Sequence, residues 1–361
     1  MVSLGSVAKR AGVVTGVVAG VAGAVYAGER AVAARIRRGG DDDQIDDTVD
    51  VEFDHFVRVD THDGGSIYAI ERTPTGRGSD ASDSSLDEAP TIVLAHGITL
   101  SSRVWARQFR TLPEAGFRTI AFDGRGHGES TVGDSGHSID NLADDLRAVL
   151  TAFDVRNAVL VGHSMGGMAV QSLAARHPEE IAARVRGIVL LSTSARAMTS
   201  DAHRTRRSLE RVVGVVPDVG AVMRQRNLGL LIARVGFGDD ADPRGVEATR
   251  QMLGACSRDT LRDAGRALLT LDFSAQLPEI NVPTLVVVGS ADVVTSPRES
   301  RQIADLIPHA ELVEFPRAGH MLMYERTEEL DRLIVDFARR CLETVPAPDR
   351  ASDGTGGHDD H

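Results

Sequence analysis

The chain has 361 residues, of which 42% are apolar and 25% are charged, with 36 Gly and 13 Pro. These values exclude a collagen-like or wholly disordered protein, and the length suits one large α/β domain with added segments. The net charge of −12 disfavours nucleic acid as a partner, because an acidic surface repels a phosphate backbone. Cys256 and Cys341 lie far apart without a neighbouring His cluster, so the sequence indicates neither a disulfide framework nor a metal site.

The first 40 residues differ in composition from the rest of the chain. Residues 11–28 form an uncharged run of small and apolar side chains that is flanked by charged residues on both sides. Eighteen helical residues span about 27 Å, close to the roughly 30 Å of a bilayer core. Gly12, Gly16 and Gly20 recur every four residues, which favours close approach of a second helix. We predict that residues 1–40 contain a glycine-zipper membrane anchor with a face suited to helix–helix self-association.

Three interpretations of this apolar segment stay open. It is an uncleaved membrane anchor, a secretory signal cleaved near the Val-Tyr-Ala sequence that ends at Ala27, or a helix that packs on the soluble domain. Four arginines between positions 30 and 38 outnumber the two basic residues that precede the segment. The positive-inside tendency then places the large domain in the cytoplasm, whereas signal cleavage would give a secreted protein.

Polar segments separate this helix from the folded part and end the chain. We interpret residues 41–53 as an acidic linker, because six Asp side chains between positions 41 and 50 repel one another and extend the chain. Residues 74–90 are rich in Gly, Ser and Asp, and the tail at 343–361 has a similar composition, which predicts disorder. The folded domain is expected over residues 54–342.

Short β-branched runs alternate with helical patterns over this domain. Strands are predicted at residues 51–59, 66–72, 91–95, 118–122, 158–161, 187–191, 284–288 and 311–315, and helices at 104–114, 139–153, 165–176, 297–306 and 327–341. The runs at 92–95 and 285–288 are apolar on both faces, as a sheet covered by helices on each side requires. The pattern predicts an α/β fold with a mostly parallel, doubly wound sheet. Residues 195–277 break the alternation and are predicted to form a helical cap between the sixth and seventh strands.

The fifth predicted strand leads into a G-x-S-x-G sequence centred on Ser164, and a helix follows. In this strand–turn–helix context the pattern indicates a nucleophile elbow, in which Gly162 and Gly166 leave room for a sharp turn that exposes the serine hydroxyl. A glycine-rich turn with a bystander serine is the alternative interpretation.

A serine hydroxyl becomes a useful nucleophile when a histidine accepts its proton and a carboxylate orients that histidine. Asp292 follows the seventh predicted strand and His320 follows the eighth, so both lie on the same edge of the sheet as Ser164. Their chain order, Ser then Asp then His, is the order that such a sheet requires. Taken singly, Asp292 could be a turn or helix-cap residue and His320 a structural histidine.

Attack on a carbonyl group also requires backbone donors for the developing oxyanion. Met165 follows the nucleophile and supplies the first N–H, and Ile98 in the loop after the third strand supplies the second. We interpret His96 as structural and His163 as packed beside the nucleophile. His127 lies in a glycine-rich turn without a second ligand nearby, so it is predicted to line the pocket and not to bind a metal ion.

The chain from about residue 54 to residue 342 resembles the α/β-hydrolase superfamily in its motifs LAHGIT, DGRGHGES, GHSMGG, GSADVV and AGH. The motifs are similar to those of the serine-nucleophile branch: carboxylesterases, monoacylglycerol-lipase-like enzymes and cofactor-free haloperoxidases or perhydrolases, which these motifs do not separate. The resemblance implies an eight-stranded sheet with a helical cap after the sixth strand, and it implies no metal or organic cofactor. Dehalogenases and epoxide hydrolases are disfavoured, because an aspartate would be expected at Ser164.

The cap sequence contains apolar stretches at 209–222 and 230–235, and Arg204, Arg207 and Arg211 fall on one helical face. One interpretation is ordinary packing on the core with solvated arginines. The other is a lipophilic acyl pocket whose basic rim meets anionic headgroups.

The sequence therefore predicts a serine hydrolase that cleaves carboxylic esters, with lipid-like acyl esters among the candidate substrates. His320, oriented by Asp292, would deprotonate Ser164, the oxyanion would rest on the N–H groups of Ile98 and Met165, and water would release the acyl-enzyme. Perhydrolase, haloperoxidase-like or acyltransferase activity with the same triad is the alternative, since the triad does not choose what attacks the acyl-enzyme. The complete triad disfavours a non-enzymatic sensor or scaffold.

Overall fold

A computed structural model describes residues 50–75, 89–197, 219–269 and 271–343. The predicted anchor at 11–28, most of the acidic linker, nearly all of the tail and the three cap arginines lie outside these ranges. Within them, no helix combines the length and the hydropathy that crossing a bilayer requires. The membrane anchor therefore stays a prediction.

The centre of the molecule is an eight-stranded sheet in the order β1-β2-β4-β3-β5-β6-β7-β8. The pairs β1–β2 and β2–β4 are antiparallel, and the neighbouring strands from β4 to β8 are parallel. The strands are β1 (His55–Asp60), β2 (Ser66–Arg72), β3 (Thr91–Ala95), β4 (Arg118–Phe122), β5 (Ala158–His163), β6 (Val185–Leu191), β7 (Thr284–Gly289) and β8 (Glu311–Phe315). The predicted mostly parallel sheet of an α/β fold is confirmed.

Strand position explains the apolar patterns. Every residue of β3, β5 and β7 is buried, because these strands lie inside the sheet and helices cover both of their faces. The outer strand β1 is mostly exposed, and it begins at His55 instead of the predicted Val51. Just before it, the Asp54 carboxylate accepts the Thr73 N–H at 2.8 Å and ends the regular pairing.

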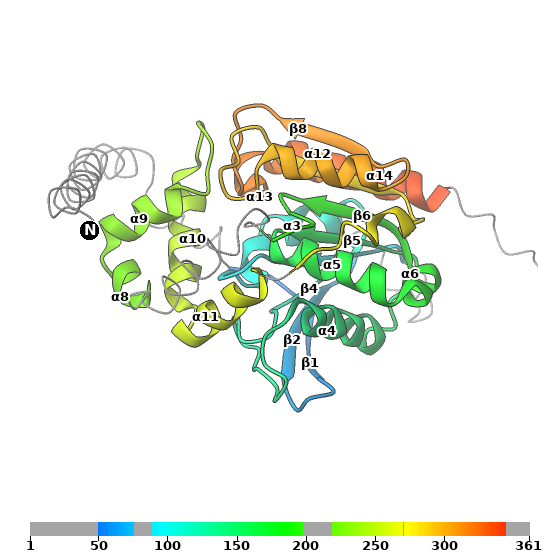
Figure 1. Ribbon diagram of the computed structural model, residues 1–361, viewed down its shortest axis with the longest axis horizontal. Coiled ribbons are helices and arrows are strands. Elements are labelled where there is room, and N and C mark those ends of the chain that lie inside the picture. Colours follow the sequence, from blue (N-terminus) through cyan, green and yellow to red (C-terminus); the bar gives the residue numbers. More distant parts are fainter. Residues whose placement is uncertain (1–49, 76–88, 198–218, 270, 344–361) are drawn as a thin grey trace, which may run out of the picture.

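Helices form a layer on each face of the sheet (Figure 1). The core between sheet and helices is split accordingly: α4, α5 and α12 pack on one face, and α3 and α14 pack on the other. The helices outside the cap are α3 (Gln108–Glu114), α4 (Ile139–Ala152), α5 (Met165–Arg176), α6 (Pro178–Arg184), α12 (Pro297–Leu306), α13 (Leu322–Glu325) and α14 (Thr327–Glu343), with 3₁₀ helices η3 (Ser102–Trp105) and η4 (Leu277–Glu279).

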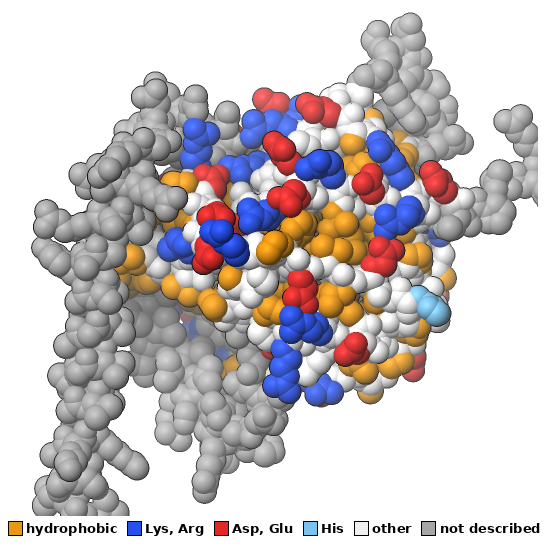
Figure 2. Space-filling model, turned by 90° about the horizontal axis from the view of Figure 1, so that it is seen from above, with side chains coloured by type: hydrophobic (Ala, Val, Ile, Leu, Met, Phe, Trp, Pro, Cys, Tyr) orange, Lys and Arg blue, Asp and Glu red, His pale blue; other side chains and the backbone are white. Residues whose placement is uncertain are grey.

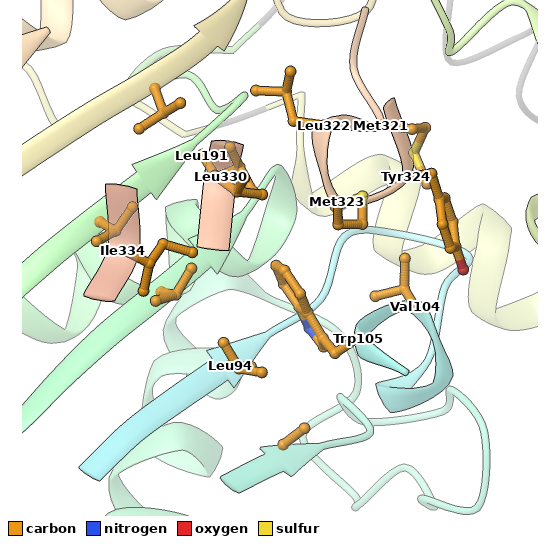
Figure 3. Packing of buried hydrophobic residues seen from close by; sticks show 14 of the residues in the cluster. Leu94, Val104, Trp105, Leu191, Met321, Leu322, Met323, Tyr324, Leu330 and Ile334 are labelled. Atoms are coloured by element: carbon orange, nitrogen blue, oxygen red, sulfur yellow. The ribbon is translucent and has the colours of Figure 1, made fainter. Parts of the chain in front are cut away.

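The helix predicted at 104–114 is divided in two, η3 and α3. The Ser102 N–H donates to Asp123 Oδ1 at 2.7 Å, which ties the first turn to the loop after β4. Trp105 at the end of η3 is fully buried. Figure 3 shows its ring among Leu94, Val104 and Met323, so η3 anchors the loop after β3 in the core.

The other edge of the sheet, β8, is protected by charge. Arg301 of α12 pairs with Glu314 at 2.6 Å, and Arg340 of α14 pairs with Glu311 at 2.8 Å. Figure 2 shows this upper face, where hydrophobic side chains lie among alternating acidic and basic ones. Such charges discourage pairing of the edge with another strand.

The predicted cap lies between β6 and β7, as expected, and its described part contains α8 (Val219–Arg224), α9 (Arg226–Arg234), α10 (Pro243–Ala255) and α11 (Arg258–Ala267). These four helices gather at the left end of the molecule in Figure 1. Thr260 Oγ1 of α11 donates to the Gly126 carbonyl at 3.0 Å, which places the cap next to the loop that follows β4.

Candidate active site

Ser164 occupies a strained turn between β5 and α5. Its backbone has φ 52° and ψ −117°, a conformation that a non-glycine residue adopts only when its surroundings enforce it. A Cβ at Gly162 would lie 2.7 Å from the Gly166 carbonyl oxygen, and one at Gly166 would lie 2.3 Å from the Ala95 carbonyl oxygen. Both glycines are therefore required by close backbone approach, and the turn has the form of a nucleophile elbow.

Asp292 and His320 are brought together by the loops after β7 and β8. His320 Nδ1–H donates to Asp292 Oδ2 at 2.9 Å, so Nε2 is left without the proton and can act as a base. The other carboxylate oxygen accepts the N–H groups of Val294 and Thr295 at 2.8 and 2.9 Å. Asp292 is thus fixed by its own turn, and it in turn fixes the tautomer and the orientation of the His320 ring.

The environment keeps Asp292 ionised. Burial alone would raise the pKa of this carboxyl, but the adjacent His320 ring and the N–H groups of Thr295 and Val294 outweigh burial and hold the pKa below its usual value. An ionised carboxylate is the form that stabilises a histidine cation. The pair can therefore accept a proton from a neighbouring hydroxyl.

His163 supports His320 from the elbow. Its Nε2–H donates to the His320 carbonyl oxygen at 3.0 Å, and the two rings lie 4.6 Å apart between centroids. Burial, together with the nearby His320, lowers the pKa of His163 well below its usual value, so the ring stays neutral. The expected packing of His163 is confirmed, and the structure adds a hydrogen bond that spans 157 residues.

The nucleophile and the base are both nearly enclosed by protein: the exposed fraction is 6% for Ser164 and 7% for His320. Within the described residues, no hydrogen bond joins Ser164 Oγ to His320 Nε2. Fully buried polar side-chain atoms without a hydrogen-bond partner do occur in these ranges, but these two atoms do not belong to them. The contact between the His163 and His320 rings nevertheless places the base beside the residue that precedes Ser164. Looser contact between nucleophile and base is common before substrate binds.

The loop after β3 lies against the elbow, where the second oxyanion donor is expected. A Cβ at Gly97 would lie 3.0 Å from His163 Nδ1 and 3.1 Å from Ser164 Cβ, so a larger residue would press on the elbow. Ile98 follows Gly97 directly, and Met165 begins α5 directly after Ser164. Ile98 and Met165 thus belong to two separate elements that meet near the serine, and their role as oxyanion donors stays a prediction.

His96 and His127 hold this loop as neutral rings. His96 Nε2 accepts the Gly124 N–H at 2.8 Å, and His127 Nε2 accepts the Thr99 N–H at 3.1 Å. Burial lowers the pKa of His96 to about 4 and that of His127 to about 3, the latter with the help of His96. His96 is structural, as predicted. His127 lines a cavity of about 830 Å³ between β2 and α10 that does not include Ser164.

Metal-ligating side chains are not grouped at this site. The described ranges contain no cluster of three or more His, Cys, Asp or Glu side chains arranged to hold a metal ion.

Sequence reasoning missed a buried ion network beside the loop after β4. Arg125 is 1% exposed and binds both oxygens of Asp145 at 2.7 Å and Asp63 at 3.0 Å. The glycine-rich motif that contains Arg125 is visible in the sequence, but the partners of Arg125 lie 62 and 20 residues away and follow no local pattern. A second missed residue, Glu325, binds the loop that carries His320.

Comparison with known proteins agrees with this architecture. Residues 87–327 match the family described as serine aminopeptidase, S33. The AB hydrolase superfamily protein YisY of Bacillus subtilis (strain 168) is 31% identical over 252 residues, which cover 68% of this chain and 91% of that protein. The bifunctional esterase/perhydrolase DCH of Acinetobacter calcoaceticus is 30% identical over 260 residues, which cover 70% of this chain and 92% of that protein.

A solved structure shares the fold. That of a thermophilic esterase from Thermogutta terrifontis, with malate bound, has a TM-score of 0.63 and 26% sequence identity, and the match covers 80% of this chain and 99% of that one. The strained serine, the Asp–His pair and these similarities agree. The chain therefore belongs to the α/β-hydrolase superfamily and, within it, to the serine aminopeptidase family S33.

Proposed function

We propose that this protein is a serine hydrolase that cleaves carboxylic esters through an acyl-enzyme on Ser164. The chain is a hydrolase that acts on ester bonds, as its family and the esterases among its relatives indicate. The observation that carries the proposed mechanism is the 2.9 Å hydrogen bond between His320 and Asp292 next to a serine held at φ 52°.

The reaction follows from this arrangement. His320 Nε2 takes the proton of Ser164 Oγ while the oxygen attacks the ester carbonyl, and Asp292 stabilises the resulting imidazolium. The N–H groups of Ile98 and Met165 donate hydrogen bonds to the oxyanion. His320 then gives the proton to the leaving alcohol, and in the second half it activates the water that releases the acid.

Replacing the nucleophile tests this mechanism. We expect Ser164→Ala to lower the kcat for p-nitrophenyl butyrate by about 10⁴-fold or more and to abolish labelling by a fluorophosphonate probe. The wild-type protein should label with one equivalent of probe. Undiminished turnover in the variant would contradict the proposal.

A related activity has specific support. The esterase/perhydrolase among the relatives favours attack of hydrogen peroxide on the acyl-enzyme as a second outcome, with acyl transfer to an alcohol as a third. Product analysis with peroxide or an alcohol present separates these outcomes from hydrolysis. An amino acid p-nitroanilide tests the peptidase activity that the family's description suggests.

Lipid-like acyl esters are the proposed substrate class. Ile232 and Val235 of the cap are 41% and 60% exposed, so part of the apolar stretch at 230–235 does not pack on the core as one interpretation expected. Exposed apolar side chains on a cap favour contact with acyl chains. An ester series from two to sixteen carbons tests this, and a steady loss of kcat/KM beyond four carbons would contradict it.

The proposed place of the enzyme is the membrane surface. Residues 11–28 would hold the domain there from the cytoplasmic side and could self-associate through their glycine row, with secretion after cleavage as the alternative. Fractionation of the full chain against a chain that begins near Gly40 tests this proposal, and equal solubility of the two would contradict it.

A further inference from the structure

Glu325 lies five residues after His320, at the end of the single-turn helix α13. Its carboxylate is partly buried and accepts two backbone N–H groups from different parts of the chain. Oε2 accepts the Gly238 N–H at 2.7 Å, and Oε1 accepts the Gly319 N–H at 3.0 Å. Gly319 is the residue directly before His320, whereas Gly238 belongs to the cap.

The cap and the histidine loop meet here backbone to backbone. The His320 N–H donates to the Gly236 carbonyl at 2.8 Å, and the Asp239 N–H donates to the Arg317 carbonyl at 2.9 Å. A Cβ at Gly238 would lie 2.6 Å from the Gly319 nitrogen, so nothing larger than glycine fits between the two segments. The Glu325 carboxylate accepts one N–H group from each of the two segments and so joins them at one side of this contact.

These bonds determine the orientation of the peptide groups around His320. The carbonyl of His320 is held by His163 and its N–H by Gly236. The preceding N–H, that of Gly319, has Glu325 as its acceptor. The Gly319 N–H is shared between Oε1 at 3.0 Å and Oε2 at 3.1 Å, and Oε2 also accepts the Gly238 N–H. A glutamine would leave one oxygen for both N–H groups and would turn its own NH₂ group towards one of them, and a buried N–H group that loses its acceptor is costly enough to rotate the peptide.

We propose that Glu325 is a positioning residue for His320: by accepting the N–H groups of Gly319 and Gly238, it locks the histidine loop against the cap and keeps the ring aligned with Asp292 and Ser164. This inference rests on the proposed role of His320 as the base. Misplacement of a catalytic group by about 1 Å can lower the rate by about a hundredfold.

The test compares Glu325→Gln with Asp331→Asn in the full chain. The control is related, because Asp331 of α14 is also a carboxylate with two donors, Gln108 Nε2 at 2.8 Å and Thr111 Oγ1 at 2.7 Å. It is more deeply buried than Glu325 and does not contact the histidine loop. The measurements are kcat and KM for p-nitrophenyl butyrate, the rate constant of fluorophosphonate labelling, the unfolding midpoint, and the low-field proton resonance of His320 Nδ1–H.

We expect Glu325→Gln to lower kcat and the labelling rate constant by about tenfold to a hundredfold, to change KM by less than about twofold, and to shift or broaden the His320 resonance. Asp331→Asn should lower the unfolding midpoint and leave kcat and the resonance unchanged. If both variants lose kcat by the same factor, or if Glu325→Gln keeps the wild-type kcat and resonance, the proposal is wrong.

Two further outcomes are a variant that does not fold and a wild-type protein without activity. Should Glu325→Gln fail to fold, Glu325→Asp keeps the charge but shortens the reach by one methylene; a lower kcat with an unchanged KM then supports the role, and a wild-type kcat overturns it. A wild-type protein that neither hydrolyses esters nor reacts with the probe refutes the proposed function. In that case the effect of Glu325→Gln on the His320 resonance still decides the positioning role.

Discussion

The two halves of the site are held in place by different forces. Ser164 and the loop at Gly97 sit at the ends of the fully buried strands β5 and β3, where backbone pairing and close glycine contacts fix them. His320 sits on a loop that is fixed by single polar contacts from Asp292, His163 and the cap. The sheet therefore determines where the nucleophile lies, while individual side chains determine where the base lies, and substitutions should affect the two halves differently.

On the histidine half, the largest effect is expected from Asp292→Asn. The amide would donate towards His320 Nδ1 and favour the wrong tautomer, so we expect kcat for p-nitrophenyl butyrate to fall by about 10⁴-fold. The unfolding midpoint serves as the control for folding. Activity within tenfold of the wild type would show that Asp292 does not orient the base.

In the buried ion network beside the loop after β4, Arg125→Met should act mainly on stability. The substitution leaves the carboxylates of Asp63 and Asp145 without their buried partner, which costs about 3–5 kcal/mol of unfolding free energy. Urea unfolding measures this loss. The remaining folded protein should retain its rate of fluorophosphonate labelling, and a variant as stable as the wild type would contradict the importance of the network.

Acid should also weaken the serine half. The His127 ring stays neutral in the folded protein down to a pKa of about 3, whereas in the unfolded chain it takes up a proton near pH 6.5. The unfolded state then binds more protons between these values, so stability falls as the pH decreases from 6.5. In His127→Gln, the loss of unfolding free energy between pH 7.5 and pH 5 should be smaller by about 2 kcal/mol. If the variant loses as much unfolding free energy as the wild type over this pH range, the His127 ring is not held neutral in the folded protein.

The smallest effect is expected at the exposed edge of the sheet. Arg301→Ala removes the ion pair with Glu314, which lies on the surface between α12 and β8. Exposed pairs contribute at most about 1 kcal/mol, so the unfolding midpoint should hardly change and kcat should stay at the wild-type value. A large loss of activity would mean that this edge is coupled to the histidine loop.

The sequence predicts the residues whose role depends on local pattern. The glycine spacing around Ser164 and the positions of Asp292 and His320 after their strands are visible in the chain, and the structure places the latter two in contact. The supports of His320 are not visible in this way. Glu325 bonds to Gly238, which is 87 residues away in the sequence, and His163 bonds to His320, which is 157 residues away. No periodicity in the sequence marks such contacts.

The position of α14 has a consequence for biosynthesis. This helix covers one face of the sheet, and a Cβ at Gly187 of β6 would lie 2.7 Å from Cys341 Sγ and 2.9 Å from the Phe337 ring. During translation, β3, β5 and β6 leave the ribosome long before α14, so part of their apolar face stays uncovered until residues 327–343 have been made. Exposed apolar surface of this kind promotes aggregation and binds chaperones. Chains that end before residue 327 should therefore accumulate as insoluble or chaperone-bound protein.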